Sequence, residues 1–244
     1  MRAVITAGGT VDGAFAEAIG TPVKALAPWG TGTLLDAVLA ACAGAGVERT
    51  AVVGGAAVRA HLAGRDDVRV LDAVDDGSVN VLHALDAWPG ERIVYLTSDL
   101  PFAGSAGVRD LIARSAPYAL TMGIAGAGAY RARFPGAADR AVRLGRERVV
   151  NACGFVIAPE AVAPLRGFAT RFFAARKSLL RMALLLGPAM TLRFALRRLE
   201  VAGVEAFAAR RLGIPVGAIR DCDPGLCYDV DALDDYRYAC ALRA

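Results

Sequence analysis

Short apolar runs alternate with helix-periodic stretches through the first hundred residues. Four runs, Arg2–Thr6, Thr50–Val53, Val68–Leu71 and Ile93–Thr97, have the length and composition of buried strands. Between them, apolar residues recur at helical spacing from Leu34 to Cys42. Strands that alternate with helices in this way predict βαβ units and a mostly parallel sheet.

Local signals define where these elements begin and end. Thr33 and Asp36 have the spacing of a capping box, which predicts a helix that runs to the glycines at 44 and 46. Ser78 is the expected cap of a second helix. Gly8 and Gly9 end the first strand, and the loop is expected to continue to about Pro22.

The second half of the chain is less regular. Strands are predicted at 118–124, 149–157, 214–219 and 227–230, and a last helix at 232–242. Residues 160–213 are helical in pattern, with a break near Gly187-Pro188. We expect one α/β domain over residues 1–244, with three α/β/α layers and a C-terminal helical insertion at about 160–213.

Composition narrows the class of protein. Hydrophobic residues make up 55% of the 244, which excludes a disordered chain, and a formal net charge of +4 is too weak to indicate a nucleic-acid partner. The longest apolar run, Met182 to Leu192, has 11 residues, whereas a membrane span needs about 20. The N-terminus lacks the apolar stretch of a signal peptide, so we expect a cytoplasmic protein without stable membrane insertion.

The cysteines do not suggest a metal centre. There are five, none in a CxxC pair, and only two histidines accompany them, which disfavours zinc. Cys222 and Cys227 flank a Pro-Gly turn, and we interpret them as two reduced thiols near a strand.

The first candidate for chemistry is the loop from Ala7 to Gly13. Its glycines would let backbone N–H groups approach an anion, but no Gly-Lys-Ser/Thr closes it, so it is neither a P-loop nor a dinucleotide fingerprint. Lys24 follows the loop, from where a lysine can contact phosphates. Of 28 basic residues, 26 are arginine, which makes this lysine unusual. Its replacement by alanine is expected to weaken binding of a phosphate ligand with little change in thermal stability.

Carboxylates form the second group of candidates. Asp99 stands at the end of a buried strand, where α/β sheets bind ligands and where a carboxylate can hold a divalent metal on a phosphate. A helix N-cap is the competing interpretation of Asp99. If 227–230 is a strand, Asp229 and Asp231 share a face, and either a metal site or a cluster of caps explains them.

Taken in order, these motifs resemble those of the MobA-like nucleotidyltransferases. The family pattern is matched by Ala7-Gly8-Gly9, Pro22 to Leu26, Ser98 to Pro101, Asn151 to Phe155 and Asp229 to Asp235. The resemblance covers most of the chain and implies a GT-A-type, Rossmann-like fold. It also implies transfer of NMP from an NTP to a phosphorylated small-molecule acceptor, with release of pyrophosphate.

The resemblance also implies roles for individual residues. Asp99 and Asp231 would bind Mg²⁺, with Asp229 in reserve, and Lys24, Asp99 and Asp231 would form the catalytic group. Nucleotide contacts are expected from Ala7, Gly8, Gly9, Lys24 and Asn80, and acceptor contacts from Asn151, Arg176, Lys177 and Arg181. Lys177 and Arg181 would share a helix face, where two like charges could hold the acceptor phosphate; a solvated basic face is the alternative. A homodimer is left open.

One departure concerns the glycine loop. Many relatives carry Arg or Lys there, whereas between Gly9 and Lys24 the charged residues here are Asp12 and Glu17. Either Lys24 and Mg²⁺ are enough to hold the triphosphate, or an arginine from elsewhere in the chain supplies the missing positive charge, or activity is reduced.

Three other interpretations of the sequence compete with nucleotidyl transfer. They are a GT-A glycosyltransferase, a catalytically weak nucleotide-binding regulatory protein, and peripheral membrane contact through the Arg-rich helices.

Overall fold

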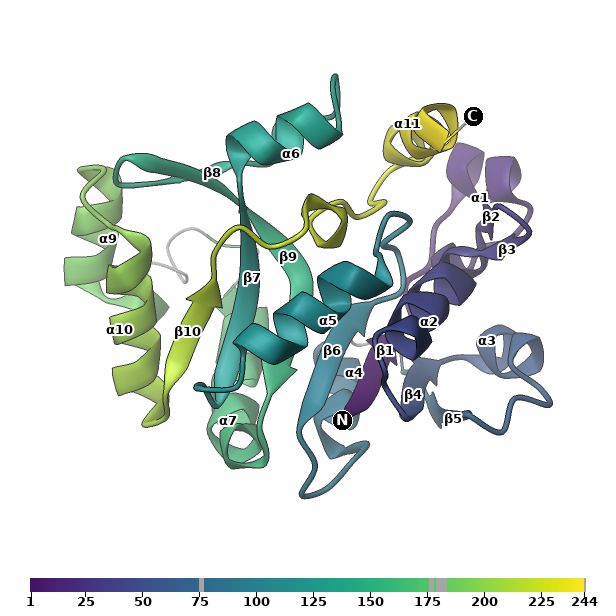
Figure 1. The fold of residues 1–244 in the computed structure, drawn as a ribbon, viewed down its shortest axis with the longest axis horizontal. Helices are drawn as coiled ribbons and strands as arrows, with labels where there is room; N and C mark the ends of the chain where they lie inside the picture. The colour runs from purple at the N-terminus through teal and green to yellow at the C-terminus, as the bar shows by residue number, and fades with distance from the viewer. Residues whose placement is uncertain (75–76, 176–177, 179–183, 244) are drawn as a thin grey trace.

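The computed structural model describes residues 1–74, 77–175, 178 and 184–243. Its sheet has the strand order β10-β7-β9-β6-β1-β4-β5, with β8 paired to β9 (Figure 1). The neighbours of β1 are parallel to it, whereas β9 is antiparallel to β6, β7 and β8. The mostly parallel α/β sheet is therefore confirmed. The strands of this sheet are β1 (Arg2–Thr6), β4 (Arg49–Gly54), β5 (Val68–Asp72), β6 (Ile93–Thr97), β7 (Leu120–Gly126), β8 (Val142–Leu144), β9 (Glu147–Ile157) and β10 (Val216–Ile219).

Helices cover both faces of the sheet. In Figure 1, α2 and α5 lie in front of the sheet and α4 and α7 behind it, while α10 flanks β10. The helices are α1 (Gly13–Ile19), α2 (Leu34–Gly44), α3 (Ala56–His61), α4 (Gly77–Asp86), α5 (Ser105–Arg114), α6 (Ala127–Arg133), α7 (Pro159–Ala175), α9 (Pro188–Ala195), α10 (Val201–Leu212) and α11 (Leu233–Arg243). The chain also forms two 3₁₀ turns, η1 (Lys24–Leu26) and η2 (Pro224–Leu226).

The core has two halves because strand side chains alternate between the faces. On β1, Ala3 and Ile5 pack into the cluster that includes α2 and α5, whereas Val4 packs with Leu85 of α4 on the other face. All three β1 residues are fully buried. A strand covered on both faces must be apolar throughout, which explains why the first strand is a continuous apolar run.

The segment after β1 contains more structure than the sequence predicts. It carries helix α1, then η1 and a hairpin of β2 (Pro28–Trp29) and β3 (Gly32–Thr33). Phe15 and Ile19 are four residues apart and both buried, and Gly20 ends α1 in a left-handed conformation at φ 71°. This spacing is a helix signal, but two apolar residues are too few to distinguish a one-face helix from a loop.

Helix starts are predicted with mixed success. The capping box of α2 is confirmed: Asp36 N donates to Thr33 Oγ1 at 3.2 Å, and Thr33 N donates to Asp36 Oδ2 at 2.9 Å. Helix α4 begins at Gly77, so Ser78 lies in its first turn and is not its cap. Propensity alone places a helix end only to within one or two residues.

The strand predicted at 227–230 is absent. This segment is irregular and follows η2, where Asp223 Oδ1 accepts a hydrogen bond from Gly225 N at 2.8 Å. Tyr228 and Val230 are buried and Asp231 is exposed, so the predicted alternation of side chains is present without a ladder. A single backbone bond, from Val230 N to Asp99 O at 3.0 Å, joins the segment to the loop after β6.

We expect Gly225→Ala to destabilise the protein by about 2 kcal/mol or more, because overpacking of this kind costs roughly 1–3 kcal/mol. A Cβ at Gly225 would lie 2.2 Å from the carbonyl oxygen of Phe102, and backbone cannot move aside as a flexible side chain would. Thermal denaturation measures the effect. Gly167→Ala in α7 is the control, since its Cβ would meet nothing within 4 Å. Equal melting temperatures for the two variants would contradict the prediction.

The predicted helical insertion falls on α7, α9 and α10, between β9 and β10. The assignment of residues 1–244 to one domain stays a prediction. Among the described residues, no helix combines the length and the apolar character that crossing a membrane requires.

Candidate active site

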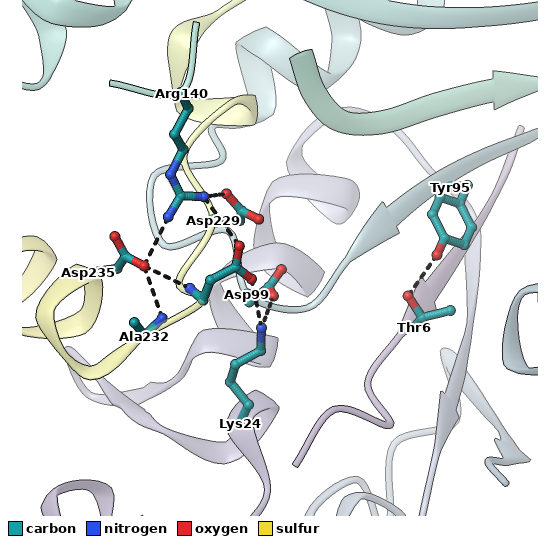
Figure 2. Close-up of polar contacts among 9 residues, drawn as sticks. Thr6, Lys24, Tyr95, Asp99, Arg140, Asp229, Ala232 and Asp235 are labelled. Atoms are coloured by element: carbon teal, nitrogen blue, oxygen red, sulfur yellow. Dashed lines mark hydrogen bonds and ion pairs between the residues drawn. The ribbon is translucent and has the colours of Figure 1, made fainter. Parts of the chain in front are cut away.

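The candidate site lies where the carboxyl ends of β1 and β6 meet. The chain runs outward from β1 to β4 and β5 and then returns to β6 on the other side of β1. Such a switch point creates the crevice in which α/β sheets bind ligands. Gly8 and Gly9 follow β1, and Asp99 follows β6. The hydroxyls of Thr6, at the end of β1, and Tyr95, in the middle of β6, lie 2.9 Å apart and share a hydrogen bond (Figure 2).

The glycine loop is paired with the segment that carries Lys24. Lys24 N donates to Gly9 O at 3.1 Å, and Val11 N donates to Pro22 O at 2.8 Å. Gly8 and Gly9 are exposed, so their backbone is open to a ligand. Ala7 is buried, and its N–H already donates to Val53 O at 2.8 Å, which leaves that donor unavailable to a nucleotide.

Lys24 and Asp99 form the centre of the site. Lys24 Nζ lies 2.5 Å from Asp99 Oδ2 and 3.5 Å from Asp231 Oδ1, and the Lys24 and Asp99 side chains are only 16% and 11% exposed. Burial alone would lower the pKa of Lys24, but the attraction and hydrogen bond of Asp99, with Asp231 and Asp229, raise it above its ordinary value. Because Lys24 is buried and ion-paired, we expect its replacement to lower thermal stability, in contrast to the small change expected from the sequence.

The late acids are brought to this centre by the segment after η2. Tyr228 and Val230 point into the core and are buried. Asp229 and Asp231 alternate with them along the chain and therefore turn toward the site. Asp235, at the start of α11, accepts hydrogen bonds from Asp231 N at 3.1 Å and Ala232 N at 2.9 Å. Asp99 and Asp231, which the resemblance pairs as metal ligands, lie close to the same Lys24 ammonium, although no strand supplies the second acid.

Arg140 is a site residue that the sequence did not reveal. Its guanidinium is ion-paired with Asp229, lies 3.5 Å from Asp231 Oδ2, and pairs with Asp235 Oδ2 at 2.9 Å (Figure 2). These acids raise the pKa of Arg140 further, against the effect of burial. Arg140 is one of many arginines between β7 and β9, and nothing in its local sequence distinguishes it. Arg140 is thus an arginine from elsewhere in the chain that lies in the site, where its partners are acids.

Asp229 has an unusual environment for a carboxylate. Burial, and then repulsion from Asp231, raise its pKa to about 6, although Arg140 opposes the shift. Burial also raises the pKa of the Cys153 thiol on β9, and the negative charges of Asp229, Asp99 and Asp231 add to that shift. The carboxylates of Asp99, Asp229 and Asp231 therefore make this part of the site strongly negative. Lys24 and Arg140 offset that charge.

This donor set fits a divalent cation. Asp99 Oδ1 is buried and has no hydrogen-bond partner, while Oδ2 already contacts a cation, the Lys24 ammonium. In the part of the chain that the structure describes, no three Asp, Glu, His or Cys side chains gather into a site of their own. Mg²⁺ is typically held by one or two carboxylates together with substrate phosphates, so Asp99 and Asp231 form a suitable pair.

The two asparagines of the prediction lie in different settings. Asn80 is buried under the glycine loop, and its amide both accepts from Val74 N and donates to Val74 O, each at 2.8 Å. A side chain at Gly8 would press on Asn80 at 3.0 Å, so Asn80 supports the loop from beneath. Asn151 is exposed on β9, two residues from Cys153 and on the same face of the strand.

The predicted acceptor cations Arg176, Lys177 and Arg181 lie outside the described residues. The buried thiols Cys222 and Cys227 are free, with their sulfur atoms 3.7 Å apart.

Solved structures resemble the whole chain. A hypothetical transferase from Thermus thermophilus has a TM-score of 0.84 and 29% identity, over 96% of this chain and 98% of that one. A nucleotidyl transferase from Methanothermobacter thermautotrophicus has a TM-score of 0.56 and 18% identity, over 99% and 97%. A Mycobacterium tuberculosis H37Rv protein, solved as a complex with manganese, has a TM-score of 0.54 and 20% identity, over 98% and 96%. The last two likenesses show the fold alone.

Sequence comparison gives the family. None of the curated proteins is similar to the chain in sequence. The family model described as the MobA-like NTP transferase domain, however, matches residues 3–200. That range includes the glycine loop, Lys24 and Asp99. The chain therefore belongs to the MobA-like NTP transferase family and is a nucleotidyltransferase.

Proposed function

We propose that the chain transfers an NMP group from an NTP to a phosphorylated small-molecule acceptor and releases pyrophosphate. One observation carries the proposal: a buried lysine ammonium between Asp99 and Asp231, beside the exposed glycine loop at the switch point of the sheet. A site with two carboxylates, one cation and open backbone donors suits a triphosphate with its metal.

The acids and the lysine would have different roles in binding the nucleotide. Asp99 and Asp231 would hold Mg²⁺, with Asp229 as a further donor, and the metal would neutralise charge on the donor phosphates. Lys24 would contact those phosphates from the position it already occupies, close to Gly9. Arg140 would keep the late acids in place and offset their repulsion. Asp99 Oδ1, which lacks a partner, gives the site a donor still free for a cation.

The reaction would need alignment more than a protein nucleophile. An oxygen of the acceptor phosphate attacks the α-phosphorus of the NTP; the bond from that phosphorus to the β-phosphate oxygen breaks, and pyrophosphate leaves with the electron pair. Holding both partners in line and neutralising the developing charge supply the rate enhancement in such transfers. Asn151, exposed on the β9 face beside Cys153, would contact the acceptor.

A thermal-shift panel of GTP, CTP, UTP and ATP, with and without Mg²⁺, tests this function. We expect one nucleotide to raise the melting temperature only with the metal, because a ligand at a hundred times its Kd stabilises by about 2.7 kcal/mol. For a chain of this length that corresponds to a shift of roughly 5–10 °C. Pyrophosphate release with phosphorylated, but not dephosphorylated, acceptors is the second measurement. No metal-dependent shift with any of the four would count against the proposal.

A further inference from the structure

A cavity lined by arginines lies beside the candidate active site, at the carboxyl ends of β7 and β10. It has a volume of about 440 Å³, within the range of small-molecule sites. Its walls come from the β7–α6 junction, the β8–β9 turn and the residues after β10. Four of the lining residues are arginines: Arg131, Arg146, Arg148 and Arg220.

The charge of this cavity is only partly balanced. Arg220 pairs with Glu147 at 2.5 Å, and Arg148 pairs with Asp139 at 2.6 Å. Within the described ranges, Arg131 and Arg146 make no ion pair, although Arg131 acts at longer range on Asp139. The acids that line the cavity are Glu147 and Asp221, so the four arginines leave a net positive charge there. An anion in the cavity would relieve their mutual repulsion.

The cavity has room for an anion to come close to the backbone. Gly126 and Gly128 line it, and a Cβ added at either would meet nothing within 4 Å. Both glycines therefore border open space. Arg131 and Arg146 are exposed, so a ligand from solvent can reach them. Arginine recognises phosphate and carboxylate through two parallel hydrogen bonds, which makes these groups the natural occupants.

The distance to the metal acids sets the size of the ligand. Asp99 follows β6, and the cavity lies at the end of β7, with β9 between them in the sheet. Two strand spacings across the sheet amount to about 10 Å. The register adds a displacement along the strands, because Leu96 of β6 pairs with Gly154 whereas Gly126 of β7 pairs with Val149. The neighbouring residues Asp139 and Arg140 connect the two places, because Asp139 pairs with Arg148 of the cavity and Arg140 pairs with the late acids.

We propose that Arg131 and Arg146 bind a second anionic group of the acceptor, at least about 10 Å from the phosphate that attacks the NTP. The inference rests on the proposed function and narrows its substrate class. The acceptor is a small molecule that carries two anionic groups at least about 10 Å apart. The first group reacts beside Asp99. The second, a phosphate or a carboxylate, binds the arginines and so positions the first group for attack.

Inorganic phosphate, titrated calorimetrically into the metal-free and nucleotide-free protein, tests the cavity directly. We expect a saturable site with a millimolar Kd, typical of about 4 kcal/mol of binding energy. The double variant Arg131→Ala/Arg146→Ala should weaken this binding at least tenfold. Both side chains are exposed and outside the ion pairs described above, so the variant should fold. Arg210→Ala, which removes an exposed arginine from α10, is the matched control and should bind as the wild type does.

Further measurements test the inference and identify the anionic group. No saturable binding up to about 50 mM, more than ten times the millimolar Kd expected from the binding energy, would overturn the inference, as would equal affinities of the double variant and the wild type. Acetate, tested in the same way, identifies the group: binding as tight as that of phosphate assigns a carboxylate, and weaker binding assigns a phosphate. The metal-dependent NTP shift must survive in the double variant. If no NTP stabilises even the wild type, the proposed function fails while the anion site stands.

Discussion

Lys24→Met should lower the melting temperature of the apoprotein by about 6 °C and at the same time tighten its binding of a divalent metal. Without the ammonium, Asp99 keeps its buried charge and loses its nearest cation, and such a charged hydrogen bond contributes about 2 kcal/mol. At this chain length, each kcal/mol corresponds to roughly 2–4 °C. Because the Lys24 ammonium already neutralises Asp99, an incoming metal must compete with it, and the variant removes the competitor.

The measurements are thermal denaturation in a chelator and calorimetric titration with Mn²⁺ or Mg²⁺. We expect metal affinity to rise roughly tenfold, equivalent to about 1.4 kcal/mol, while NTP affinity and turnover fall. Arg237→Met removes the same charge from an exposed position, where Arg237 is 67% exposed, and should change neither quantity. A Lys24→Met protein with wild-type stability and metal affinity would show that Asp99 does not depend on this lysine.

Asp99→Asn should reduce turnover by at least a hundredfold, the scale of losing one well-placed electrostatic group in an active site. The amide has nearly the same shape, so the loss reflects charge and metal binding and not packing. Calorimetry with Mn²⁺ should show weaker binding in the absence of nucleotide, which provides a readout independent of activity. Asp231→Asn should have a similar effect on turnover, with a smaller effect on stability, because its side chain is 62% exposed.

Asp234→Asn is the control for both acids. Asp234 belongs to the same acidic cluster at the start of α11, but its side chain is 95% exposed and pairs only weakly with Arg237, at 3.8 Å. Its variant should retain wild-type turnover and metal binding. Turnover of Asp99→Asn within about threefold of the wild type, far from the hundredfold expected, would remove Asp99 from the metal site.

What the sequence could predict depended on how local the signal was. The capping box of Thr33 and Asp36 lies within four residues, and it forms as predicted. The buried strand Ile93–Thr97 and the acid after it are also local patterns. The direction of β9 is not a local property: a run of apolar residues looks the same in a parallel and an antiparallel strand, so its antiparallel pairing emerges only from the fold.

Long-range contacts explain the remaining differences. The strand predicted at 227–230 is instead an irregular segment next to the 99–102 loop, to which Val230 N donates a hydrogen bond at Asp99 O. Arg140 and Asp229 are 89 positions apart, and no spacing rule connects them. The arginine cavity gathers residues from three segments, and only the sheet order brings those segments together.

The backbone hydrogen bond between Val230 and Asp99 affects when the site can form during synthesis and folding. Lys24 and Asp99 lie in the first half of the chain, whereas Asp229 and Asp231 lie near its end, and Tyr236 of α11 bonds to Pro28 O at 2.7 Å across a separation of 208 residues. Contacts of such high order form late, after the loop-closure entropy has been overcome. During synthesis, Lys24 and Asp99 leave the ribosome well before Asp229 and Asp231 do. A nascent polypeptide can therefore build most of its sheet before the late acids reach Asp99.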